Sequence, residues 1–263
     1  MHLREGPHVL AMAAAYASWH RRRFDAFPPF AQLDAMWAAH AGRELAHERL
    51  RATGSLHVGD VSALKSSLDA PGLVVVALTE LGSIRAAVAC LKACGAATVM
   101  PVWGASADYT QVLDLCRVEV LDLREGSSGL VEQLARAQRS GLLPALLLEA
   151  PSAGRRHHDF LEHRVPCSRL IEVLARRTRS RIVCIWNHVA EDGAIESCHK
   201  EFSWGTASLT QRMLTFLDDR VRREAAQYCW ENTAILFKDR DFIADLALNM
   251  PEILRWRGKR SES

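Results

Sequence analysis

The sequence has no apolar run long enough to cross a membrane as a helix. A membrane-spanning helix needs about 18 or more consecutive apolar residues, and no stretch of the 263 residues reaches that length. The N-terminus also lacks the basic start, apolar centre and small-residue cleavage site of a signal peptide. We therefore expect a cytoplasmic protein with no transmembrane segment.

The chain also has little net charge. Its 33 lysine and arginine residues nearly balance its 31 aspartate and glutamate residues, which leaves a formal charge of +2 at pH 7. Binding to nucleic acid depends on a positive field over the protein surface, because the phosphate backbone supplies most of the attraction. The composition provides no such field, and we expect no nucleic-acid partner.

Paired Cys-x-x-Cys spacings are missing as well. The seven cysteines are scattered along the chain, several of them within apolar segments. Paired spacings are typical of zinc sites and redox-active pairs, whereas isolated cysteines in apolar segments pack in the core as small thiols. The sequence therefore predicts buried, reduced cysteines and no bound metal.

Short apolar runs alternate with helical patterns through most of the chain. The runs comprise residues 72–78, 97–102, 118–123, 144–150 and 181–186. Runs of this length, bounded by glycine, proline or polar residues, are typical of strands, and those at 72–78 and 144–150 are expected to be buried. Their alternation with helices predicts an α/β fold with a mostly parallel central sheet flanked by helices. The turn Glu191-Asp192-Gly193 predicts a hairpin after the last run.

The chain is expected to form one domain, residues 1–263. Residues 1–68 have helical patterns only and form a lead-in, residues 69–240 form the core, and residues 241–263 form a C-terminal helix and tail. Neither an internal repeat nor a long linker divides these parts.

Polar residues follow two of the predicted strands directly. Glu80, Ser83 and Arg85 come after the strand at 72–78, and Glu149 stands at the end of another strand. In open α/β sheets, ligands bind at the carboxyl ends of strands, next to helix N-termini. We therefore expect these four side chains to face one cleft.

A loop rich in cations and imidazoles follows Glu149. It contains Arg155, Arg156, His157 and His158. Guanidinium groups match the geometry of phosphate oxygens, so the two arginines are candidates for holding the phosphate of a phosphopantetheine arm or a nucleotide-like carrier. A solvated surface loop is the alternative interpretation.

Seven segments occur in an order typical of one enzyme family. They are Glu80–Arg85, in the place of a His-x-Gly-Asn-Trp-Glu type motif, then Leu146–Gly154, Phe160–Pro166, Leu174–Thr178, Ile182–Gly193, Ala207–Gln211 and Gln227–Trp230. In this order, the chain from about residue 30 to residue 237 resembles the lipid A late acyltransferases, the lauroyl and myristoyl transferases of the glycerolipid acyltransferase superfamily. The resemblance implies that superfamily's fold and acyl-transfer chemistry.

The resemblance also implies roles for individual residues. The family's general base is a histidine with an acidic residue five positions on, and these positions hold Glu80 and Arg85, so the motif is degenerate. The base is then either Glu80 or an imidazole from the loop at His157 and His158. The candidate catalytic residues are Glu80, Arg85 and His158, and the candidate substrate-binding residues are Ser83, Glu149, Arg155, Arg156 and His157.

Two functions follow from this resemblance. In the first, the protein moves an acyl group from an acyl carrier protein or coenzyme A thioester to an amine or hydroxyl of a small metabolite, with the phosphopantetheine-linked donor as substrate and no bound cofactor. In the second, it is a non-catalytic homologue in which Glu80 and Arg85 form a structural ion pair. The cleft then binds an acyl chain, a carrier protein or a partner enzyme.

Overall fold

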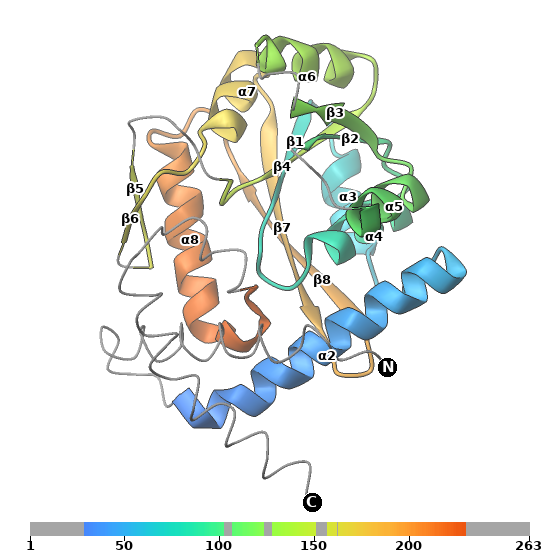
Figure 1. The fold of residues 1–263 in the computed structure, drawn as a ribbon. Helices are drawn as coiled ribbons and strands as arrows, with labels where there is room; N and C mark the ends of the chain where they lie inside the picture. The colour runs from blue at the N-terminus through green and yellow to red at the C-terminus, as the bar shows by residue number, and fades with distance from the viewer. Residues whose placement is uncertain (1–28, 103–106, 124–127, 151–156, 162, 230–263) are drawn as a thin grey trace, which may run out of the picture.

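A six-stranded sheet forms the centre of the protein (Figure 1), in a computed structural model that describes residues 29–102, 107–123, 128–150, 157–161 and 163–229. Its strand order is β3-β2-β4-β1-β7-β8. All neighbouring strands are parallel except β8, which is antiparallel to β7. The strands are β1 (Val74–Leu78), β2 (Thr98–Val102), β3 (Glu119–Asp122), β4 (Leu143–Leu147), β7 (Arg181–Val189) and β8 (Ile195–Phe202). The predicted mostly parallel sheet and the hairpin after the last apolar run are confirmed.

Helices cover both faces of this sheet (Figure 1). One face packs against α3 (Ser62–Asp69), α4 (Ile84–Ala93) and α5 (Ala107–Leu115), and the other against α6 (Leu130–Arg139), α7 (Leu170–Thr178) and α8 (Leu209–Arg223). Two clusters of buried apolar side chains result, one on each face of the sheet. This three-layer arrangement confirms the α/β class.

Strand β1 shows why two clusters form. All of its residues are buried. Val75 and Ala77 belong to the cluster under α7 and α8. Val74, Val76 and Leu78 belong to the cluster under α4. Because successive side chains of a strand point to opposite faces, a strand that is apolar at every position fits between two layers of helices.

A long helix, α2 (Pro29–Thr53), crosses the edge of the sheet at which β7 ends (Figure 1). Gly42 permits this close approach, since a Cβ atom there would lie 2.1 Å from the carbonyl oxygen of Ala190. The helix thereby brings one face to the carboxyl ends of the central strands. The helical lead-in is confirmed in its described part, whereas residues 1–28 and the expected C-terminal helix at 241–263 lie outside the described residues.

The cysteines are free, and all but Cys198 are buried, as predicted. Burial raises the pKa of Cys90 to about 12, so its thiol stays protonated and unreactive. Within the described ranges, no group of three or more His, Cys, Asp or Glu side chains is placed to hold a metal ion. No helix in those ranges has the length and apolar character needed to span a bilayer.

A short antiparallel ribbon, β5 (His158–Phe160) and β6 (His163–Val165), precedes α7. The expected loop position of His158 is wrong, because this residue begins β5. Strands of three residues are too short to produce a periodic pattern, so the sequence carries no signal for them.

Candidate active site

Two buried glutamates, Glu80 and Glu149, lie next to each other at the carboxyl ends of β1 and β4. The backbone N–H of Glu80 donates a 3.1 Å hydrogen bond to Oε1 of Glu149, and the two residues are 6% and 4% exposed. The hydroxyl of Tyr228 donates to the same oxygen at 3.4 Å. The other oxygen of Glu149, Oε2, is buried without a hydrogen-bond partner in the described structure. The two residues predicted at this edge of the sheet therefore lie side by side, and both are shielded from water.

The environment of Glu149 changes its acidity. Burial and, to a smaller extent, the charge of Glu80 raise the pKa of Glu149 to about 8. The hydrogen bonds that its carboxyl group accepts lower the pKa, but by less. Burial and the charge of Glu80 also raise the pKa of Tyr109, on α5, to about 12. A carboxyl group with a pKa near 8 holds its proton at neutral pH and can donate it to a substrate.

We expect Glu149→Gln to remove a pH-dependent loss of stability. The pKa of Glu149 in the folded protein, about 8, lies above its ordinary value of 4.5. The folded state therefore holds a proton that the unfolded chain releases between these pH values, so wild-type stability falls as pH rises through this window. Glutamine does not ionise, and its side-chain oxygen can still accept both hydrogen bonds.

Urea denaturation across pH measures this effect. The free energy of unfolding of Glu149→Gln relative to wild type should change little below pH 4.5 and then grow by up to about 1.4 kcal/mol per pH unit toward pH 8. A difference that does not vary with pH would contradict a raised pKa at this residue.

A histidine from α2 lies at the same edge. Nε2 of His47 is 3.0 Å from Oγ of Ser83, and Nη1 of Arg85 is 3.0 Å from Nδ1. Glu44, one turn earlier on α2, has a carboxylate oxygen 3.7 Å from the same Nδ1. Burial lowers the pKa of His47 more than the nearby carboxylate of Glu44 raises it. The imidazole is therefore neutral at pH 7.

Local structure holds Ser83 in place. Its Oγ caps α4 by accepting a hydrogen bond from the N–H of Ala86 at 3.3 Å. Its backbone N–H and C=O both bond to the side-chain amide of Asn187 at the end of β7, each at 2.9 Å. Gly82 precedes it with φ of +93°, and a Cβ atom at that glycine would lie 2.0 Å from the carbonyl oxygen of Asn187. The turn between β1 and α4 is thus defined by contacts with β7.

His158 has a different set of neighbours. Burial lowers the pKa of His158, and the charged groups that act on it most are Arg169 and Glu172, at the start of α7. Gln211 of α8 hydrogen-bonds to the backbone of the next residue, Asp159, and Nε2 of His158 is buried without a hydrogen-bond partner in the described structure. The imidazole next to Ser83 is instead that of His47, from α2.

The remaining predicted residues, Arg155, Arg156 and His157, follow β4 in the sequence. His157 is exposed. Arg155 and Arg156 lie outside the described residues. Their expected role in phosphate binding stays a prediction.

Sequence reasoning missed His47 and Glu44. Both lie in a helical pattern that indicates packing, and their spacing of three places them on one helix face. This spacing was the only sequence signal that could have paired the two side chains. No sequence pattern connects His47 with Ser83, because Ser83 lies 36 positions further along the chain.

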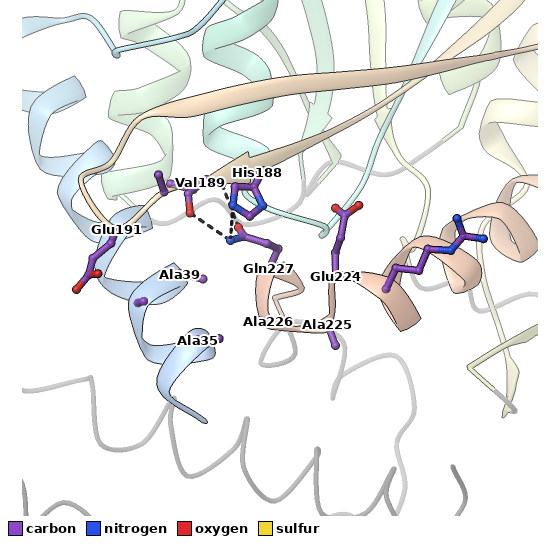
Figure 2. A pocket seen from close by; sticks show the side chains of 12 residues that line it. Ala35, Ala39, His188, Val189, Glu191, Glu224, Ala225, Ala226 and Gln227 are labelled. Carbon is purple, nitrogen blue, oxygen red and sulfur yellow. Dashed lines mark hydrogen bonds between the residues drawn. The ribbon is translucent and has the colours of Figure 1, made fainter. Parts of the chain in front are cut away.

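A groove of about 460 Å³ lies beside the site (Figure 2). The groove is lined by α2, the end of β7 and the short helix η2 (Ala225–Gln227), and its wall includes Ala35, Ala39, Ala225, His188 and Glu224. Gln227 connects it to the site, because its carbonyl oxygen accepts a 2.8 Å hydrogen bond from the N–H of Gly82. A groove of this size is sufficient for a small molecule.

Comparison with known proteins does not assign the chain to a family. No protein-family model matches the sequence, and a search of curated proteins finds no significant match. Any function must therefore be argued from the geometry of the site, with the resemblance in segment order as a hypothesis.

Proposed function

We propose that the protein is an acyltransferase. It moves an acyl group from a phosphopantetheine-linked thioester, on an acyl carrier protein or coenzyme A, to the amine or hydroxyl of a small metabolite. The observation that carries this proposal is the neutral imidazole of His47, 3.0 Å from the hydroxyl of Ser83 at the carboxyl edge of a parallel sheet. His47 supplies the base that the degenerate Glu80–Arg85 motif lacks once Arg85, which contacts Nδ1 in this structure, has moved to the donor phosphate.

Other groups at this edge fit the same chemistry. Arg85, in the first turn of α4, provides a cation for the phosphate of the donor, together with the predicted Arg155 and Arg156. Glu149 holds a proton at neutral pH, so it adds no second negative charge next to Glu80 where the anionic donor would bind. The charge of Glu80 helps to keep this proton on Glu149.

The groove beside Gln227 provides a place for the acceptor. Its wall combines the alanines of α2 with the polar side chains of His188 and Glu224 (Figure 2). An apolar surface with a few polar groups is typical of small-molecule sites. We assign the acceptor to this groove because Gln227 contacts both the groove and the turn that carries Ser83.

Thiol release from a panel of acyl thioesters tests this proposal. The panel contains acyl-coenzyme A and acyl carrier protein donors of several chain lengths, each with and without a mixture of small amines and alcohols. We expect at least one donor to release thiol faster when an acceptor is present. No release with any donor would contradict the proposal and favour a non-catalytic homologue that binds an acyl chain, a carrier protein or a partner enzyme.

A further inference from the structure

We propose that Ser83 is a nucleophile that accepts the acyl group, with His47 as its base and Glu44 as the residue that orients His47. The inference rests on the proposed function for the identity of the acyl donor. Oγ of Ser83, the two ring nitrogens of His47 and the carboxylate of Glu44 follow one another at 3.0 and 3.7 Å. This order of hydroxyl, imidazole and carboxylate is the one that acyl-transfer triads use on unrelated folds.

The position of Ser83 suits a nucleophile. It joins β1 to α4, so its hydroxyl lies at the N-terminus of a ten-residue helix. The first N–H groups of a helix have no carbonyl partner within the helix and carry partial positive charge. Donors placed in this way stabilise the oxyanion that forms when a hydroxyl attacks a thioester. Ser83 and His47 are 4% and 7% exposed, which limits access of bulk water to an acyl ester.

The reaction then has two steps. In the first, Oγ of Ser83 attacks the thioester carbonyl carbon while its proton passes to Nε2 of His47; the C–S bond breaks, and the thiolate leaves with that proton. The products are an ester on Ser83 and a free thiol. In the second step, the amine or hydroxyl of the acceptor attacks the ester and gives a proton to Nε2, and Oγ of Ser83 leaves and recovers this proton. No oxidant or reductant is required.

Arg85 and Glu44 compete for the same nitrogen of His47. A guanidinium group only donates hydrogen bonds, so Nδ1 must present a lone pair where Arg85 lies 3.0 Å away. In that tautomer the proton of the neutral ring is on Nε2 and is donated to Ser83, and His47 cannot accept the proton of Ser83. Contact with Glu44 requires the opposite tautomer, with the proton on Nδ1 and Nε2 free.

The two tautomers of His47 correspond to a resting state and an active state of the site. The structure has the contact that favours the resting tautomer, since the distance from Nδ1 to Arg85 is shorter than the distance to Glu44. When an anionic group of the bound donor attracts Arg85, the guanidinium group moves away from Nδ1. Nδ1 can then carry the proton and donate it to the carboxylate of Glu44. Binding of the donor thereby activates Ser83.

Prolonged labelling of the full-length wild-type chain with a fluorophosphonate, a probe that reacts with activated serines, tests the inference, because the two tautomers interconvert and the minor, active one reacts irreversibly. After proteolysis, mass spectrometry should locate the adduct on Ser83. Adducts confined to other serines, or none at all, would overturn the inference. This measurement needs no variant, so it remains decisive if a substitution prevents folding.

Substitutions then test the roles of the two competing residues. We expect Arg85→Leu to raise the labelling rate about tenfold and Glu44→Gln to lower it about tenfold, because they shift the tautomer in opposite directions. Ser83→Asn, which preserves a capping side chain, should abolish labelling. Arg136→Leu, at an exposed position of α6, is the matched control and should change nothing. A slower reaction or an unchanged rate in Arg85→Leu would overturn the competition between Arg85 and Glu44.

The two proposals fail in different ways. Labelling of Ser83 without thiol release from any thioester contradicts the acyltransferase and supports the nucleophile. Acceptor-dependent thiol release without any adduct on Ser83 contradicts the nucleophile and supports the acyltransferase, with His47 acting directly on the acceptor.

Discussion

His47→Gln is expected to lower the rate of thiol release by about two to four orders of magnitude, the usual contribution of a general base. A glutamine side chain can still donate a hydrogen bond to Ser83, but it cannot take a proton at neutral pH. Binding of the donor should change much less than the rate. The loss should therefore appear in kcat, measured under saturating thioester.

The control for this prediction is His57→Gln. His57 is exposed and follows the same helix α2, so its replacement removes an imidazole without touching the site. Its rate should equal that of the wild type. A folded His47→Gln protein that retains more than about a tenth of the wild-type rate would contradict the role of His47 as base and return that role to Glu80.

Gly82→Ala is expected to destabilise the protein by about 3 kcal/mol or more. The alanine would have to adopt φ of +93°, and its Cβ would lie 2.0 Å from the carbonyl oxygen of Asn187. That oxygen belongs to the backbone of β7, so the end of the strand would have to move. The hydrogen bonds between Asn187 and the backbone of Ser83 would be displaced as well.

The variant Gly95→Ala separates the backbone contribution to this loss of stability from the steric contribution. Gly95 also has a positive φ, +77°, but a Cβ atom there would have no neighbour within 4 Å. Its replacement should cost about 1 kcal/mol, the backbone part alone. Urea denaturation of both variants measures the difference, and equal losses of stability would contradict a steric limit at Gly82.

Local patterns in the sequence predicted most of the fold. The run at 74–78 is apolar at every position, so it predicts a strand covered on both faces, and β1 has that environment. The Glu191-Asp192-Gly193 turn predicts the hairpin of β7 and β8. Both signals depend on residues close in the chain, which is why they can be recognised without a structure.

The rule for parallel sheets also placed part of the site. Strands that run in the same direction end at the same edge, so Glu80 and Glu149 could be expected near one another. The rule does not give their distance, burial or acidity. These depend on Tyr228, on the neighbouring strands and on the exclusion of water, all of which are long-range properties.

By itself, the sequence determined the α/β class, the strands of the sheet and the polar turn from Glu80 to Arg85 at the end of β1. The tertiary structure alone decided which imidazole faces that turn. His47 reaches Ser83 because α2 packs across the end of β7, where Gly42 lets the helix approach Ala190. Such contacts join residues far apart in the chain, and no local propensity or spacing records them.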